Sequence, residues 1–432
     1  MDFRRESASL TPTLVALRHR LHAHPELALD LPWTQREVLR ALDGLGLEIA
    51  TGSSCSSITA VLRGGHPGPL VLLRGDMDGL PGTEESGLPF AAPPGTMHAC
   101  GHDLHTAGLV GAAMLLAAHR EEMHGDVEFM FQPGEEAGSG AKTMIAEGVL
   151  EAAGRTPDAA YAIHVIPGPR GAILSRPGAV LAGSNDLHVT MHGRGGHGSS
   201  PFAAIDPVPA LIDLAQAIPV MITRRFSVFD PVVASITQLG AGTAINVIPA
   251  QASLGATVRT VSPTMPERFG DEVRRLADGI ASAHGCTADV DFSVLYPVTA
   301  NDPTEYAAAM STLRATFGAS RVIRLKDPLM GSEDFSCILD RVPGAFILLA
   351  STPKGVDPMT AVNHSPRARF DDAVLGDQAA ALATLVWARQ TRGTETDGRG
   401  PTPGAAGPAM ADADDVGVDI EKLAHDAGED SR

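Results

Sequence analysis

The chain has 432 residues with 33 basic and 51 acidic side chains, which gives a net charge of −18. Residues 393–432 hold ten acidic and three basic side chains, so −11 remains for residues 1–392. An acidic surface repels phosphate, which makes nucleic acid and anionic membranes poor partners. No apolar run reaches about 18 residues, so we expect a globular chain without a transmembrane helix.

The cysteines and the N-terminus bear on the compartment. The four cysteines, Cys55, Cys100, Cys286 and Cys337, are widely spaced and do not suggest a disulfide framework. The N-terminus has charged residues but no apolar stretch behind them, so it does not read as a signal peptide. We therefore expect a reducing, cytoplasmic location.

Helices and strands are expected to alternate in the first 165 residues. Apolar residues at helical spacing predict helices over 10–29 and 34–45, and a small, apolar run predicts a buried helix over 106–119. Short apolar runs predict strands at 61–62, 70–73, 127–131 and 159–165. This alternation favours an α/β fold with a mixed, mostly parallel sheet.

The middle of the chain follows a different order, strand–helix–strand–strand–helix–strand, which is ferredoxin-like. The ranges are 187–191, 207–218, 232–239, 252–261, 266–284 and 288–294. The α/β pattern then resumes, with helices predicted at 304–317 and 371–389 and a strand at 345–349.

We therefore expect one domain inserted into another. An α/β catalytic domain is predicted over residues 1–182 and 298–392, with a ferredoxin-like α+β insert over 183–297. The acidic stretch 393–432 is rich in Gly, Pro, Ala and Asp and lacks aromatic residues, so we expect it to be disordered.

The densest group of polar residues lies directly before the predicted buried helix. Three histidines, Cys100 and Asp103 lie within nine residues. Cys100 and His102 are two residues apart, so a turn can direct both toward one point, and thiolate and imidazole are ligands of zinc. A buried cysteine is also a common small hydrophobe, so this cluster alone leaves a metal site and a structural role both open.

Carboxylates follow two of the predicted strands. Glu135 and Glu136 come after strand 127–131, and neighbours in an extended chain point to opposite sides, so one can bind metal while the other faces a substrate. An ordinary solvated strand end is the alternative. Asp76 and Asp78 follow strand 70–73, at the carboxyl end where active sites of parallel sheets gather.

Two more histidines stand apart from the cluster. His164 lies within the apolar strand 159–165, where a histidine is more often a core residue than a ligand, and His364 lies in a loop. The stretch 193–198 matches the dinucleotide pattern GxGxxG, but no long helix follows it. The chain has no GxSxG and no HExxH, which argues against a serine α/β-hydrolase and a thermolysin-type zinc site.

Taken together and in this order, the segments resemble the M20 metallopeptidase family, and within it the amidohydrolase branch of aminoacylase, hippurate hydrolase and indoleacetyl-amino acid hydrolase types. The similarity covers about residues 10–389. The matching stretches are LRHRLHAHPEL (17–27), RGDMDGLP (74–81), MHACGHDLHTA (97–107), QPGEEAGSGAKTMIAEG (132–148), HVIP (164–167), GRGGHGSSP (193–201), INVIPAQASLGATVRT (245–260), GSEDF (331–335) and NHSP (363–366).

The resemblance implies a centre of two divalent metal ions, which could be zinc, manganese, nickel or cobalt. Position by position, it implies a catalytic base at Glu135 and five ligands, which are Cys100, His102, Glu136, His164 and His364. Asp78 matches a carboxylate that orients a ligand imidazole, and Asp76 stands where related branches have a ligand histidine.

The resemblance also implies residues that contact the substrate. In the insert, His197 matches a donor to the oxyanion and Asn246 matches a substrate contact. The turn at Gly331 and Ser332 matches the part that receives the substrate carboxylate, and Arg259 is a weaker candidate. The insert is expected to act as a lid and to mediate a homodimer or a dimer-based oligomer.

The function implied is hydrolysis of the amide bond of an N-acyl amino acid or a small dipeptide-like amide by a metal-activated water. One alternative is a binding or regulatory protein with a degraded metal site, which the presence of all five ligands and the base disfavours. Another is cleavage of a carbamoyl or ureido bond, but that branch normally has a different ligand set, without Cys100. The acyl group and the amino acid stay open.

Overall fold

A computed structural model describes residues 1–137 and 139–392. The expected disorder of residues 393–432 lies outside this part. The described chain divides into two compact units, each with its own hydrophobic core. The first comprises Met1–Val180, Ala300–Asp327 and the described residues from Cys337 on, and the second comprises Leu181–Thr299 and Pro328–Ser336.

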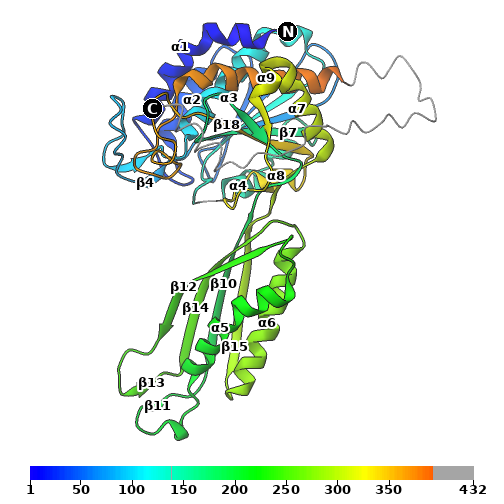
Figure 1. Ribbon diagram of the computed structural model, residues 1–432. Helices are drawn as coiled ribbons and strands as arrows, with labels where there is room; N and C mark the ends of the chain where they lie inside the picture. The colour runs from blue at the N-terminus through cyan, green and yellow to red at the C-terminus, as the bar shows by residue number, and fades with distance from the viewer. Residues whose placement is uncertain (138, 393–432) are drawn as a thin grey trace, which may run out of the picture. The chain divides into compact units, whose positions relative to one another are not determined.

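The first unit is built around an eight-stranded sheet (Figure 1). Its order is β1 (Glu48–Thr51), β2 (Ile58–Leu62), β6 (Val127–Gln132), β3 (Val71–Asp76), β7 (Ala159–Ile166), β18 (Gly344–Ala350), β8 (Ile173–Ser175) and β17 (Val322–Arg324). The four central strands run parallel, whereas β1, β2 and β8 make antiparallel pairs. This confirms the predicted mixed, mostly parallel sheet.

Strands β3, β6 and β18 are buried along their whole length, and β7 everywhere except at the partly buried His164, because helices cover the sheet. Helices α3 and α9 pack on β3 and β7, and α1 packs on both helices. The helices are α1 (Phe3–His22), α2 (Pro32–Leu42), α3 (His102–Ala118), α4 (Gly140–Ala146), α7 (Pro303–Phe317) and α9 (Leu375–Thr391). Short 3-10 turns lie at Arg120–Glu122, Val149–Glu151, Ala319–Arg321 and Asp372–Val374, and β4 (Leu80–Gly82) pairs with β5 (Gly95–Met97).

Several predicted helix boundaries were wrong, and two of them have a clear physical reason. The first helix ends at His22 rather than near residue 29, because Pro25 disfavours helical geometry in the residue before it. The buried helix begins at His102 rather than 106, since the polar residues of the cluster form its first turn and are themselves buried.

The second unit is an antiparallel four-stranded sheet, in the order β12 (Val232–Ala241), β14 (Gln251–Thr260), β10 (Gly183–His192) and β15 (Thr287–Tyr296). Helices α5 (Pro207–Arg225) and α6 (Met265–Ala283) lie side by side against it (Figure 1). The chain order is therefore strand–helix–strand–strand–helix–strand. A small ribbon joins β11 (Gly196–His197) to β13 (Val247–Ile248), next to a 3-10 turn at Pro201–Ala203.

The chain passes between the units four times. Three of the crossings lie within short elements, which are β9 (Gly178–Leu181), β16 (Thr299–Asn301) and α8 (Ser336–Leu339), and the fourth lies between Asp327 and Pro328. The segment Pro328–Ser336, which the sequence did not separate from the larger domain, falls in the second unit. None of the helices in the described part of the chain is long and apolar enough to cross a membrane.

Candidate metal centre

A glycine turn brings Cys100 and His102 together at the start of α3. Gly101 between them has a φ of +84°, a left-handed conformation that costs other residues roughly 1–2 kcal/mol. A Cβ at this position would lie only 2.3 Å from Cγ2 of Val165. Glycine therefore meets both the backbone and the space requirement, and it leaves Cys100 just before the helix and His102 as its first residue.

The five ligands that the sequence suggests lie close to one another in the first unit. Ligand atoms of Cys100, His102 and Glu136 all lie within 4.8 Å of one another. The Sγ atom of Cys100 is 3.5 Å from Nε2 of His164, and Oε1 of Glu136 is 3.2 Å from Nε2 of His364. Residues from α3, β7 and three loops thus meet near the carboxyl ends of β3, β6 and β7.

His364 is held in an unusual backbone conformation. Its φ is +68°, and its backbone N–H donates a hydrogen bond of 2.8 Å to the carbonyl of Ala99. Such a conformation persists in a residue other than glycine only when its surroundings hold it there, and these positions cluster at functional sites. The bond to Ala99 ties the His364 loop to the turn that carries Cys100.

The charges in this group favour a thiolate. Burial raises the pKa of the Cys100 thiol, but the charge of His164 and the neighbouring imidazoles of His102 and His364 outweigh it, so the pKa lies well below its usual range. Hydrogen bonds with Cys100 and Glu136 raise the pKa of His364 to about 10. The imidazole of His364 therefore holds a proton at a position from which it would bind a metal ion.

The donor set fits a metal ion. Nδ1 of His102 donates to the carbonyl of Asp78 at 2.9 Å, whereas its buried Nε2 has no hydrogen-bond partner among the described residues. A buried polar atom without a partner is costly unless something absent from the coordinates satisfies it. Thiolate, imidazole and carboxylate are the three ligand types of zinc sites.

Asp78 connects His102 to the two glutamates. Its carboxylate accepts the backbone N–H groups of Glu135 at 3.1 Å and Glu136 at 3.0 Å. The backbone carbonyl of Asp78 accepts a hydrogen bond from Nδ1 of His102, and Oδ1 of Asp78 lies 3.3 Å from the same Nδ1 atom. One residue after β3 therefore orients both an imidazole and the turn that holds Glu135 and Glu136, each largely buried.

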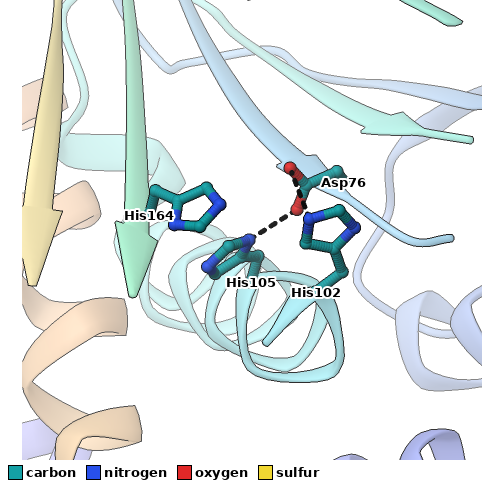
Figure 2. A group of neighbouring side chains, drawn as sticks. All are labelled: Asp76, His102, His105 and His164. Atoms are coloured by element: carbon teal, nitrogen blue, oxygen red, sulfur yellow. Dashed lines mark hydrogen bonds and ion pairs between the residues drawn. The ribbon is translucent and has the colours of Figure 1, made fainter. Parts of the chain in front are cut away.

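Asp76, at the end of β3, is completely buried and paired. It lies 2.5 Å from Nη1 of Arg74 and 2.5 Å from Nδ1 of His105 (Figure 2). Burial raises the pKa of its carboxyl, but the charges of Arg74 and His102 and the hydrogen bond from His105 hold the pKa well below its usual range. Its Oδ2 is 3.6 Å from Nε2 of His102, so this charge lies next to the candidate metal ligands, while Arg74 neutralises it and His105 forms a hydrogen bond with it.

Two residues near the site have no role in the sequence interpretation. His105 lies one helical turn after His102, with its ring between those of His102 and His164 (Figure 2). Nδ2 of Asn363 lies 3.6 Å from Sγ of Cys100, 3.3 Å from its carbonyl and 3.2 Å from the carbonyl of Val165. The i, i+3 spacing from His102 and the position next to His364 are the signals that point to them.

The predicted substrate residues belong to the second unit. His197 pairs with Val247 in the β11–β13 ribbon, and the carbonyl of Asn246 accepts the N–H of Gly198 at 2.8 Å, so the exposed His197 lies next to Asn246, which is in the exposed turn before β13. Gly331 and Ser332 lie in the segment Pro328–Ser336. In β14, Arg259 donates to the hydroxyl of Thr257 at 2.7 Å. The roles of these residues stay predictions.

Known proteins resemble this chain in sequence and in fold. The pattern of peptidase family M20/M25/M40 matches residues 72–388. Thermostable carboxypeptidase 2 of Saccharolobus solfataricus is 35% identical over 86% of this chain and 94% of its own length. N-acetylcysteine deacetylase of Bacillus subtilis is 35% identical over 86% of this chain and 96% of its own.

Solved structures agree with these relatives. A dinuclear metal-binding peptidase of the M20 family from Bacillus subtilis superimposes with a TM-score of 0.75. It is 32% identical and covers 88% of this chain and 98% of its own. The relatives also include IAA-amino acid hydrolase ILR1-like 5 of Arabidopsis thaliana, at 34% identity over 86% of both chains. The chain therefore belongs to peptidase family M20/M25/M40, and within it to the amidohydrolase branch.

Proposed function

We propose that this enzyme uses two divalent metal ions to hydrolyse the amide bond of N-acyl amino acids or of small dipeptide-like amides. The observation that carries the proposal is the group of thiolate, imidazole and carboxylate donors at the carboxyl ends of β3, β6 and β7. The relatives support it, since one is named for deacetylating N-acetylcysteine, one as a carboxypeptidase and one structure as dinuclear.

The proposed ligands are Cys100, His102, Glu136, His164 and His364. Cys100 is the proposed bridge between the ions, since a thiolate can bind two metals and its Sγ lies among the donors of the other residues. Zinc suits this mixed donor set, and manganese, nickel and cobalt are the other candidates.

Glu135 is the proposed general base. Bound metal ions would supply a water of lowered pKa and polarise the carbonyl of the substrate. The Glu135 carboxylate then takes the proton of the attacking water and passes it to the leaving amine. The hydrogen bond from its backbone to Asp78 fixes its place next to Glu136.

The second unit is the proposed lid and dimerisation domain. His197 would donate to the oxyanion, Asn246 would contact the substrate, and Gly331 and Ser332 would receive its carboxylate. Support for a homodimer comes from β12, which lies at an edge of its sheet and exposes Val233 and Leu239, among other side chains. An exposed edge strand offers unpaired backbone groups to a second chain.

We also propose that the protein is cytoplasmic and that neither nucleic acid nor a membrane is its partner. The support is that all four cysteines are free and buried and that the chain is acidic. A reducing compartment would keep the Cys100 thiolate available to metal.

The role of Glu135 is tested by E135Q, which keeps the shape of the side chain and removes the base. Turnover of N-acyl amino acids should fall by about 10²–10⁴-fold, the usual contribution of a general base. Metal content, measured by elemental analysis, should stay at the wild-type value. Near-normal turnover would overturn the mechanism.

The role of Cys100 is tested by C100A. Loss of a bridging thiolate should remove metal from both positions, and elemental analysis of the purified protein measures this directly. Two ions retained per chain would contradict the bridge. A panel of acetyl, benzoyl, indoleacetyl and long-chain acyl substrates, with dipeptides and ureido compounds, run with each candidate metal, then identifies the substrate class.

A further inference from the structure

His105 makes two hydrogen bonds that run in opposite directions from its ring. Nδ1 lies 2.5 Å from Oδ1 of Asp76, and Nε2 lies 2.8 Å from the backbone nitrogen of Val165. A backbone N–H can only donate, so Nε2 is the acceptor and carries no proton. The ring proton is therefore on Nδ1, facing the carboxylate, and both nitrogens are in use.

Because of these hydrogen bonds, His105 is not one of the proposed metal ligands, although its ring lies next to them. Its nitrogens are close to ligand atoms of His102, His164 and Asp76. The lone pair that a metal ion would need on Nε2 is already directed at a backbone N–H. The side chain is 1% exposed, so the ring has little freedom to turn away from these partners.

The two hydrogen bonds connect strands that separate at this point. Strands β3 and β7 are paired from Val71 and Ala159 up to Arg74 and Ala162, and the pairing stops there. Both strands continue beyond it, because β3 stays paired with β6 up to Asp76 and β7 stays paired with β18 up to Ile166. The imidazole of His105 thus bridges the ends of two strands that no longer bond each other directly.

The ring also lies between two of the proposed ligands. Its centroid is 4.4 Å from that of His164 and 5.4 Å from that of His102 (Figure 2). Val165, which His105 holds, directly follows His164 in β7. A shift of Val165 would therefore move His164 relative to Cys100 and His102.

We propose that His105 is a positioning residue, a neutral imidazole that joins the ends of β3 and β7 and so sets the place of His164 in the metal centre. The inference rests on the proposed function, since it takes His164 to be a ligand. Residues that hold ligands in this way commonly change metal affinity by about 10–100-fold when they are replaced.

Two substitutions separate the hydrogen bonds. H105N keeps a donor near the position of Nδ1 and loses the acceptor for Val165, whereas H105Q keeps an acceptor near Nε2 and loses the donor to Asp76. We expect H105N to lower zinc affinity by about 10–100-fold and H105Q to stay nearer the wild-type value. Competition with a chromophoric chelator measures zinc affinity. Absorption of the cobalt(II) form reports the geometry at Cys100, and its bands should shift in H105N.

A neighbouring residue provides the matched control. Thr106 is buried on the same helix and donates to the carbonyl of Asp76 at 2.8 Å, but this bond does not reach β7. T106V should bind zinc as the wild type does. An equal loss of affinity in T106V and H105N would show a general packing effect and overturn the proposal, as would wild-type affinity in H105N.

A measurement on the unmodified chain covers the case in which H105N does not fold. Nitrogen-15 spectra of histidine-labelled protein should show His105 as neutral with its proton on Nδ1, and a proton on Nε2 would contradict the bond to Val165. If the wild-type chain binds neither zinc nor cobalt, the proposed metal centre is wrong and the role of His105 falls with it. If the wild-type enzyme is active and H105N binds zinc with the same affinity, only the role of His105 is overturned.

Discussion

His364, a proposed metal ligand, holds a proton that a bound cation would have to displace. The pKa of His364 is raised to about 10 by its hydrogen bonds with Cys100 and Glu136, so at neutral pH its imidazole is protonated. Because a metal ion needs the deprotonated ring, metal affinity should increase with pH up to about 10, and binding near pH 7 should release protons. Calorimetry in buffers of different ionisation enthalpy measures the number released, and binding without proton release would contradict this.

A second prediction concerns Glu128, a buried carboxyl on β6. It is 0% exposed, and neither side-chain oxygen has a hydrogen-bond partner within the described ranges. Burial, and then the charge of Glu151, raise its pKa to about 8. In the unfolded chain the carboxyl ionises near 4.5, so the free energy of unfolding should fall as pH rises from about 4.5 to 8 and then level off.

E128Q should remove this pH dependence and stabilise the protein above pH 8 by several kcal/mol, since each pKa unit is worth about 1.4 kcal/mol. Urea unfolding at a series of pH values measures the effect. E121Q is the control, because Glu121 is exposed and should leave the curve unchanged. A parallel pH dependence in E128Q and the wild type would show that another group is responsible.

The sequence suggested the proposed ligands, but it did not suggest the residue that we propose to position them. Cys100, His102 and Glu136 belong to short, dense motifs, and the structure brings them within 4.8 Å of one another. His105 binds Asp76 and Val165, which lie 29 and 60 residues away, and no pattern in one sequence reports which buried residues bond across such distances.

At the scale of elements, a buried cluster of charges fastens α1 to the start of α3. Oδ2 of Asp103 accepts from Nε of Arg18 and from Nδ1 of His22, both at 2.8 Å, and all three side chains are buried. Burial lowers the pKa of His22, but Asp103 and Glu84 raise it to about 9, so the ring is charged near pH 7. Two buried cations next to His102 thus share this aspartate, and each has one further carboxylate partner, Asp372 for Arg18 and Glu84 for His22.

D103N should therefore be strongly destabilising. It leaves Arg18 and His22 without their shared counter-charge. Removing one partner of a buried ion pair lowers the free energy of unfolding by about 3–5 kcal/mol. Urea unfolding measures the loss. The control is D372N, since Asp372 also bonds Arg18, at 2.6 Å, but is 32% exposed and should cost less. Equal losses in the two variants would contradict a special role for Asp103.

Helices and long strands were predictable from periodicity, whereas short strands were not. The range 304–317 was expected as a helix and the structure has α7 at Pro303–Phe317. Strands β1, β8 and β17 have three or four residues each and were missed. Such segments are too short to show alternation, and they become strands only because a neighbouring strand offers them hydrogen bonds.

At the scale of the whole molecule, the charge divides at the end of α9. Residues 1–392 carry −11 and hold every motif of the family, whereas residues 393–432 carry −7 and hold none. The family pattern ends at residue 388, close to the same point. The proposed chemistry therefore requires nothing from the last forty residues.

A chain ending at Arg392 should keep its turnover and its free energy of unfolding. The described end of α9 is anchored to Glu305, which lies 2.9 Å from Nε of Arg389 and 3.3 Å from Nη2 of Arg392, and this chain keeps both contacts. A chain ending at Ala388 is the control. It loses both arginines and leaves Glu305, a largely buried carboxylate, with the hydroxyl of Tyr161, so it should be less stable. Measurement of kcat/KM and urea unfolding on both chains tests this, and a loss of turnover in the chain ending at Arg392 would give residues 393–432 a part in catalysis.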